Sequence, residues 1–282
     1  MIILICGSGT MGRGIALASI QSGHTAFVYD AFPEALGKAK AFIDSQIDKS
    51  VSKGLFSQEQ AAILKDSCMY LETLDEHVKK ADIIIEAIIE SSDAKEALFT
   101  MIEQAGLREG TILATNTSSL SVNVLCKQRK YPSSFIGLHF FNPAHIMKLV
   151  EIVKTPSTDQ SGLDTALNYC ISLNKVPVIA KDVPGFIVNR VARNYYNEAM
   201  RIAMEQAASI EQIDTIMKSA GFKMGPFELM DLIGNDINLE VTKSVFAQYF
   251  NDPRFTPSLM QQDYVNAGLY GKKSGSGFYD YE

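Results

Sequence analysis

The stretch Ile2-Ile-Leu-Ile-Cys-Gly-Ser-Gly-Thr-Met-Gly12 decides the fold of this chain. Its first five residues are all apolar, which is typical of a strand buried on both faces of a parallel sheet. Three glycines follow, and residues Arg13 to Ser22 then have the apolar spacing of a helix. A second apolar run, Thr25 to Tyr29, ends at Asp30. This order of strand, glycine turn, helix, strand and acid predicts a doubly wound α/β domain that binds a dinucleotide.

Each glycine of the turn has a separate physical role in such a domain. Gly7 allows the tight turn, Gly9 lets a pyrophosphate approach the backbone, and Gly12 lets the helix pack against the strand. Asp30 is expected to accept hydrogen bonds from ribose hydroxyls and to repel a 2′-phosphate. No Lys or Arg stands at positions 31 and 32, so NAD is favoured over NADP. The alternative is a flexible glycine turn before an ordinary helix.

The next segments predict a helical hairpin and the rest of an α/β sheet. Residues 33–54 form a long amphipathic pattern, and Ser57 with Gln60 has the spacing of a capping box that starts a helix through Leu64. Plain crossover helices are shorter, so this pair of helices is interpreted as an insertion. Further strands are expected at 81–90, 111–115, 135–141, 149–153 and 176–179, and further helices at 94–104, near 120 and at 162–173.

Beyond the turn residues Lys181 to Gly185, the pattern is helical throughout. Helices are expected at 186–206, at 209–220 with Ser209 as the cap, and at 226–249. The predicted fold is therefore a Rossmann-type, mostly parallel α/β sheet with a helical-hairpin insertion, followed by an all-α C-terminal domain. The predicted domains are residues 1–183, which bind NAD, and residues 184–282, which serve substrate binding and dimerisation.

Composition excludes several classes of protein. The chain has 282 residues, 46% of them hydrophobic, and a net charge of −6 without a block of basic residues, so a nucleic-acid surface is not expected. The four cysteines are scattered, which favours reduced thiols in a cytoplasmic compartment over disulfides, and no metal motif occurs. No apolar run reaches the roughly 20 residues that span a membrane.

Two polar residues interrupt apolar strand patterns further along the chain. His139 lies within Phe135 to Phe141, and Glu151 lies within Leu149 to Val153. Each is costly to bury alone, whereas an imidazole that faces a carboxylate makes both tolerable. Such a pair is also a base, because the carboxylate fixes the imidazole tautomer and stabilises its charged form. The alternative is a histidine that is merely satisfied within the core.

Polar residues at the predicted strand ends are candidates for ligand contacts. Glu90 ends one strand and is a candidate near the nicotinamide ribose, since ligands bind at strand carboxyl ends in such sheets. Residues 116–119, Asn-Thr-Ser-Ser, follow the next strand and either bind substrate or cap a helix. Asn189 is either a core amide or directed at the site. Lys49 and Lys53 share a helix face, and they are either ligand contacts or solvated side chains of an exposed helix.

Five blocks of sequence, spread over the whole chain, resemble the L-3-hydroxyacyl-CoA dehydrogenase family. The likeness is greatest to its bacterial 3-hydroxybutyryl-CoA dehydrogenases. The blocks are Gly7-Ser-Gly-Thr-Met-Gly12, Asn116-Thr-Ser-Ser-Leu120, His139 to Glu151, Asp182-Val-Pro-Gly-Phe-Ile-Val-Asn-Arg190 and Met224-Gly-Pro-Phe-Glu-Leu-Met-Asp231. One departure from the family is His145, which stands where the family has a small apolar residue. This histidine is a candidate for altering the acyl pocket or the pH profile.

The resemblance implies a role for each matching residue. His139 is implied to be the general base for the 3-hydroxyl proton, and Glu151 to orient it. Ser118 is implied to hydrogen-bond the substrate oxygen, and Asn189 to hold substrate and histidine in register. Implied cofactor contacts are Gly7, Gly9, Thr10, Met11, Gly12, Asp30, Glu90, Lys95 and Asn116. Implied substrate contacts are Ser118, Asn142, Lys53 and Lys49, the lysines toward the CoA moiety.

The activity that the resemblance implies is the NAD-dependent interconversion of (S)-3-hydroxybutyryl-CoA and acetoacetyl-CoA, in fatty acid and butyrate metabolism. A homodimer formed through the residues after 185 is also expected. Two alternatives remain at this point. One is a dehydrogenase of the same fold that acts on a free sugar acid such as L-gulonate, and the other is a non-catalytic structural relative.

Overall fold

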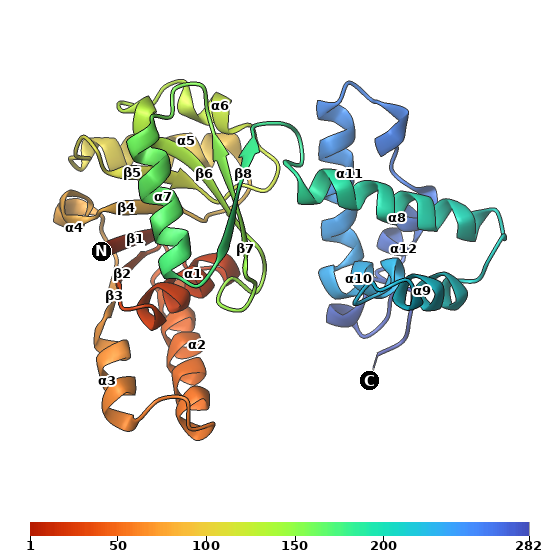
Figure 1. Ribbon diagram of the computed structural model, residues 1–282, viewed down its shortest axis with the longest axis horizontal. Coiled ribbons are helices and arrows are strands. Elements are labelled where there is room, and N and C mark those ends of the chain that lie inside the picture. The colour runs from red at the N-terminus through yellow and green to blue at the C-terminus, as the bar shows by residue number, and fades with distance from the viewer. Residues whose placement is uncertain (282) are drawn as a thin grey trace. The chain divides into compact units, whose positions relative to one another are not determined.

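The computed structural model describes residues 1–281 and divides into two compact units, Met1–Asp182 and Val183–Glu282. The first unit is built on one eight-stranded sheet with the order β3-β2-β1-β4-β5-β6-β7-β8 (Figure 1). Its strands are β1 (Ile2–Cys6), β2 (Thr25–Tyr29), β3 (Cys68–Leu71), β4 (Ile83–Glu86), β5 (Ile112–Thr115), β6 (Phe135–Phe140), β7 (Leu149–Lys154) and β8 (Val176–Lys181).

The direction of the strands determines where a ligand binds. The strands from β3 through β6 pair in parallel, β7 is antiparallel to β6, and β8 is parallel to β7. The carboxyl ends of six parallel strands therefore meet at one edge of the sheet, which is where open α/β sheets bind their ligands. The Rossmann-type, mostly parallel sheet predicted from the sequence is confirmed.

Both faces of the sheet are covered, which explains why the strands are continuously apolar. Alternate strand residues such as Ile3 and Ile5 join one core cluster with α1 (Thr10–Gln21) and α7 (Gln160–Ser172). The opposite face packs against α4 (Asp75–Lys80) and α5 (Ser92–Gln104), where the rings of Phe99 and Phe135 meet edge to face. The short helix α6 (Val122–Cys126) follows β5.

The predicted helical hairpin is present between β2 and β3. It consists of α2 (Pro33–Ser52) and α3 (Gln58–Asp66), and Ser57 with Gln60 forms the predicted capping box at the start of α3. Ile43 and Ile47 of α2 join the main core, as does Ala61 of α3.

Three predictions for the first unit need correction. The strand expected over 81–90 is only β4 (Ile83–Glu86), so Glu90 lies beyond the strand, just before α5. Two short elements, β3 and α4, were not expected. Their four and six residues are too few to carry a clear periodic pattern.

The second unit is helical, as expected, and has its own core. Its helices are α8 (Val188–Met204), α9 (Ile210–Ser219), α10 (Pro226–Ile233), α11 (Asn235–Gln248) and α12 (Leu259–Asn266). The single helix expected over 226–249 is wrong. Gly234 has a φ of +101°, a conformation that only glycine adopts readily, and it breaks the run into α10 and α11.

The C-terminal residues of the helical unit are held by the buried carboxylate of Asp231. Its oxygens accept the backbone N–H groups of Phe278 and Tyr279 at 3.0 and 2.9 Å and the Tyr281 hydroxyl at 3.0 Å. Asn235 donates a further bond at 2.9 Å. The ring of Phe278 packs on that of Phe227, which anchors the tail to the core of this unit.

Within residues 1–281, no helix is both long and apolar enough to cross a membrane. The four cysteines, which are all within this range, are buried and form no disulfide.

Candidate active site

His139 and Glu151 lie directly opposite each other on β6 and β7. The antiparallel register pairs the two residues, and His139 Nδ1 lies 2.7 Å from Glu151 Oε2. Their side chains are 7% and 1% exposed, respectively. Because a carboxylate only accepts, the imidazole donates its Nδ1 proton, and this fixes Nε2 as the nitrogen that can exchange a proton with a ligand.

The loop after β5 is tied to the end of β6 beside this pair. The Asn116 side-chain oxygen accepts the backbone N–H of Phe140 at 2.9 Å. Thr115 at the end of β5 pairs with Gly137, two residues before His139. The Asn-Thr-Ser-Ser segment and the histidine therefore lie at the same edge of the sheet.

A carboxylate shapes the segment that contains Ser118. Glu90 Oε1 accepts the backbone N–H groups of Ser118 and Ser119 at 2.9 and 3.0 Å and the Thr117 hydroxyl at 2.5 Å. Burial acts to raise the pKa of Glu90, but the charge of Lys95 and the bonds from Thr117 and Ser118 outweigh it, so the pKa is lowered. The carboxylate thus remains charged and holds the turn together.

Lys95 connects this turn to the sheet. Its ammonium lies 2.6 Å from Glu86 Oε1 and 3.1 Å from Glu90 Oε2, and the Lys95 and Glu86 side chains are 1% and 0% exposed. The second oxygen of Glu86 accepts the Thr115 hydroxyl at 2.7 Å. The lysine is therefore enclosed by two carboxylates, one at the end of β4 and one before α5.

Glu86 was not identified from the sequence. Its signal is an acid inside the apolar run Ile83 to Ile89, which resembles the interruption that identified Glu151. Because Glu90 was assigned to the strand end, the residue that does end β4 was taken as part of a buried strand.

The glycine turn after β1 leads into the N-terminus of α1. Added to Gly7 or Gly12, a Cβ would meet backbone oxygen at 2.4 or 1.7 Å, whereas at Gly9 it would meet nothing within 4 Å. Gly9 is also the N-cap of α1, and no side chain caps the helix. The space above Gly9 and the uncapped amides fit a pyrophosphate.

Asp30 lies at the end of β2 and is bonded to the glycine turn. Its Oδ2 accepts both the backbone N–H and the hydroxyl of Ser8 at 2.7 Å, and its Oδ1 accepts the Phe32 N–H at 3.1 Å. The acid therefore holds the glycine turn while its half-buried carboxylate still has lone pairs for ribose hydroxyls. With the space above Gly9, these donors and acceptors fit NAD.

The loop between β6 and β7 contains Asn142 and His145. Lys175 holds this loop by donating to the backbone oxygens of Ala144 and Met147, both at 2.7 Å. Asn142 is exposed, whereas the half-buried His145 ring lies edge to face with Phe42 of α2 at 5.8 Å. Burial, with a smaller effect of the Lys175 charge, lowers the pKa of His145. The His145 ring therefore packs against the helical hairpin through Phe42.

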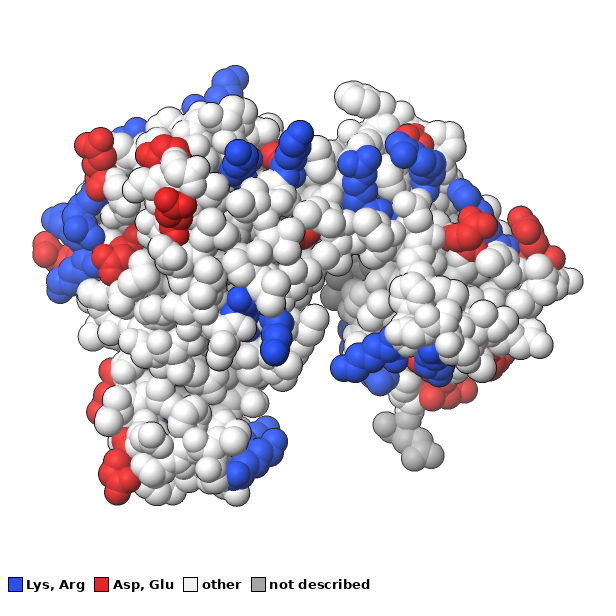
Figure 2. Space-filling model, viewed as in Figure 1, with Lys and Arg blue, Asp and Glu red and all other residues white. Residues whose placement is uncertain are grey.

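The remaining candidate residues are on the helices α2 and α8. Lys49 is in the last turn of α2 and Lys53 is its C-cap, and both side chains are exposed. Figure 2 shows basic side chains on one flank of the hairpin tip and acidic side chains on the other. Asn189 is in the first turn of α8, in the helical unit.

A buried imidazole that can exchange a proton, at the same sheet edge as a glycine turn suited to a dinucleotide, is the arrangement that a nicotinamide-dependent dehydrogenase needs. The doubly wound sheet brings both features to one edge.

Comparison with known proteins identifies the family. Residues 2–183 match the NAD binding domain of 3-hydroxyacyl-CoA dehydrogenase, and residues 185–281 match its C-terminal domain. The chain therefore belongs to the 3-hydroxyacyl-CoA dehydrogenase family, and its first unit is the NAD-binding domain of that family.

Three relatives illustrate the similarity. A 3-hydroxyadipyl-CoA dehydrogenase of Escherichia coli is 42% identical over 99% of this chain, but the chain spans only 58% of that protein. A 3-hydroxybutyryl-CoA dehydrogenase of Clostridioides difficile is 38% identical and is covered to 99%. The crystal structure of (S)-3-hydroxybutyryl-CoA dehydrogenase from Ralstonia eutropha, 34% identical, superposes with a TM-score of 0.94 over 100% of this chain and 99% of that one.

Proposed function

We propose that this chain catalyses the NAD-dependent interconversion of short-chain 3-hydroxyacyl-CoA and 3-oxoacyl-CoA, with (S)-3-hydroxybutyryl-CoA and acetoacetyl-CoA as a substrate pair. The observation that supports this most directly is the buried His139–Glu151 pair at the sheet edge that also carries the dinucleotide turn. When bound, NAD supplies the hydride acceptor of the oxidation.

In this proposal, His139 takes the proton of the substrate 3-hydroxyl at Nε2 as C3 is oxidised. Glu151 keeps the other nitrogen protonated and stabilises the imidazolium that results. Ser118 hydrogen-bonds the same substrate oxygen, and Asn189 keeps the substrate aligned with the imidazole. In the reverse direction, His139 returns the proton to the developing alkoxide.

Glu86 and Lys95 act in this proposal as positioning residues. Lys95 cannot contact a ligand easily because its ammonium is enclosed by two carboxylates at 2.6 and 3.1 Å. It neutralises Glu90, which in turn holds the backbone of Ser118 and Ser119. Asn116 has a similar role, because its carboxamide oxygen is bonded to the backbone of β6. Glu90 and Asn116 border the nicotinamide end of the cofactor, and Asn142 borders the substrate.

The CoA part of the substrate is assigned to the exposed lysines of α2. Lys49 and Lys53 lie one helical turn apart. Within residues 1–281, neither lysine forms an ion pair with a carboxylate. Ammonium groups at such a position suit the phosphates of CoA.

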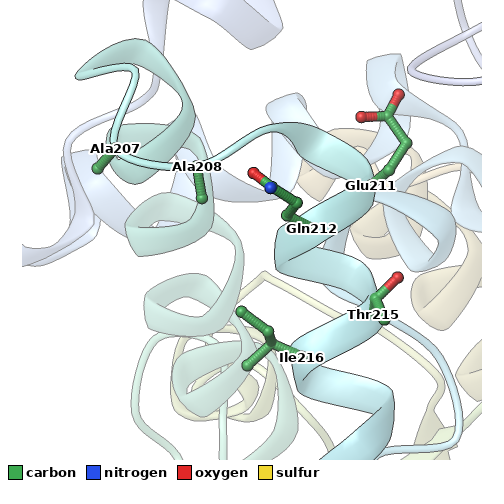
Figure 3. Close-up of a pocket in the computed structure, with 6 residues that line it drawn as sticks. All are labelled: Ala207, Ala208, Glu211, Gln212, Thr215 and Ile216. Carbon is green, nitrogen blue, oxygen red and sulfur yellow. The ribbon is translucent and has the colours of Figure 1, made fainter.

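A homodimer through the helical unit is part of the proposal, as is a cytoplasmic location with reduced cysteines. The α8–α9 turn and α9 form an open pocket lined by Ala207, Ala208, Glu211, Gln212, Thr215 and Ile216 (Figure 3). Ile216 is 62% exposed, and Phe222 just after α9 is also exposed. Exposed apolar side chains such as these are suited to contact with a second chain.

NADH consumption at 340 nm with acetoacetyl-CoA tests the proposed function. Free acetoacetate and NADPH serve as parallel controls. Turnover that requires both the thioester and NADH is the expected result. Turnover of the free acid would favour a sugar-acid type of substrate, and the absence of turnover with both would favour a non-catalytic relative.

A further inference from the structure

Arg13, one residue after the glycine turn, carries a charge that no acid neutralises. Its guanidinium lies over the Phe42 ring of α2, 4.4 Å from the ring centroid. Within residues 1–281, Arg13 forms no ion pair, and its Nε has no hydrogen-bond partner. The side chain is only half-buried. The ring contact therefore holds the guanidinium in place while its outer N–H donors stay open to a ligand.

A second arginine of the same unit shows the arrangement that serves the fold alone. The Arg129 guanidinium also lies over a ring, that of Phe99 at 5.0 Å, but it is paired with the carboxylates of Glu96 and Glu103. Arg13 has the ring contact without the carboxylates. A guanidinium that is held in one orientation and lacks an acid is suited to bind a phosphate or carboxylate through two parallel hydrogen bonds.

Three elements of the first unit fix this guanidinium. His145, in the loop between β6 and β7, lies edge to face with Phe42, so the ring is held from this loop as well as from α1. The same loop crosses α1 beside Arg13, because a Cβ added to Gly14 would meet the Ala144 Cβ at 3.2 Å. The cluster is thus built by α1, α2 and the loop that follows the strand of the proposed base.

The Phe42 ring lies in line with the two exposed lysines of α2. Lys49 and Lys53 follow Phe42 by about two and three helical turns, so the three side chains share one face of the helix. This spacing corresponds to about 10 and 16 Å along the helix. A ligand that extends from the β6–β7 loop toward the lysines therefore passes the Arg13 guanidinium.

The two acids in the middle of α2 do not neutralise this face. Asp44 binds the Lys40 ammonium and Asp48 binds the Lys65 ammonium, with a nitrogen-to-oxygen distance of 2.7 Å in each pair. The charge of Arg13 therefore stays available to an anionic ligand.

We propose that Arg13 binds the diphosphate of a CoA thioester, with Lys49 and Lys53 on the 3′-phosphate. This inference rests on the proposed function and identifies a residue that determines its specificity for CoA. Phe42 and His145 act as positioning residues for the guanidinium. The planar fork of Arg13 matches two phosphate oxygens, whereas a lysine supplies only a point charge. A thioester without phosphates gains nothing from Arg13.

NAD also carries a diphosphate, and Arg13 directly follows Gly12 of the dinucleotide turn. CoA is favoured because the guanidinium is held on a ring in the middle of α2, on the face that carries the exposed lysines. The test therefore measures the two ligands separately.

Thioesters with and without phosphates test the proposal. The full-length protein with NADH is assayed with acetoacetyl-CoA, with acetoacetyl-dephospho-CoA, which lacks the 3′-phosphate, and with acetoacetyl-pantetheine, which lacks all phosphates. Arg13→Met should lower kcat/KM about 10- to 100-fold for the two thioesters that have the diphosphate and leave the third within about 3-fold, because only hydrogen bonds to a charged group are lost. Equal losses for all three thioesters, or a loss confined to acetoacetyl-CoA, would overturn the assignment to the diphosphate.

Binding measurements separate CoA from NAD and do not depend on turnover. In Arg13→Met, the Kd of CoA measured by calorimetry should rise about 10-fold or more, whereas the Kd of NADH measured by its fluorescence should stay within about 3-fold. The reverse result would assign Arg13 to the cofactor and overturn the inference. Binding of CoA through Arg13 without turnover of any thioester would overturn the proposed function and support the inference.

Two further variants show whether the fork of Arg13 or only the charge of α2 attracts CoA. Lys40→Met is the matched control, because this ammonium is already paired with Asp44, and it should leave the Kd of CoA within about 3-fold. Arg13→Lys keeps the charge without the fork and should recover only part of the affinity. Equal effects of Lys40→Met and Arg13→Met would overturn the inference, since the general charge of the helix would then explain binding.

Discussion

At the scale of single residues, the His139–Glu151 pair supports the clearest prediction. His139→Gln keeps a polar side chain of similar size but cannot take a proton, so turnover of acetoacetyl-CoA should fall by about 10²–10⁴-fold. Binding of NADH, measured by its fluorescence, should be unchanged because the imidazole is not part of the dinucleotide turn. Turnover within a few-fold of the original protein would remove His139 as the base.

Lys95 allows a second prediction at this scale. Removing one partner of a buried ion pair leaves a buried charge, which costs about 3–5 kcal/mol, so Lys95→Met should strongly lower the free energy of unfolding in urea. Lys40 is the matched control, because its ammonium lies 2.7 Å from Asp44 in a pair that is much more exposed. Lys40→Met should change stability by less than about 1 kcal/mol. Similar effects of the two substitutions would contradict the view that the network supports the fold.

His145 predicts a pH dependence of stability. Burial lowers its pKa, so the folded state takes up the proton at a lower pH than the unfolded state. The neutral imidazole therefore makes its full contribution to the free energy of unfolding above a pH of about 6.5. This contribution is lost as the pH falls through the folded-state pKa. His145→Gln should reduce the loss of stability between pH 7.5 and 5.5, measured as urea midpoints. An unchanged loss would show that other groups cause it.

At the scale of elements, Asp30 at the end of β2 sets a prediction about the cofactor. The carboxylate accepts two bonds from Ser8 at 2.7 Å, and we propose that its charge repels a 2′-phosphate. Asp30→Ala should therefore weaken NADH and relax the discrimination against NADPH, with the ratio of the two kcat/KM values falling about 10-fold or more. Asp30→Asn is a useful comparison, since it retains hydrogen bonding to Ser8 without the charge. An unchanged ratio in both variants would assign the preference to another residue.

The elements also show what could be predicted from the sequence and why. The glycine turn, the long hairpin helix and the β6 and β7 strands have strong local patterns, and all were located. β3 and α4 are too short for a period, and the break at Gly234 depends on one backbone angle. At the site, the pairing of His139 with Glu151 was expected from the cost of burial. The Glu86–Lys95–Glu90 connection depends on which side chains meet in three dimensions, and no local pattern determines that.

At the scale of the whole molecule, the prediction concerns assembly. A chain of 31.0 kDa that exposes Ile216 and Phe222 around one helix should associate through that surface. Light scattering at micromolar concentration is expected to give about twice the mass of one chain. Ile216→Asp places a charge in the proposed contact and should shift the mass toward one chain, whereas Ile63→Asp on the exposed face of α3 should not. A single-chain mass for the unmodified protein would end the dimer proposal, and an unaltered dimer in Ile216→Asp would move the contact to another part of the helical unit.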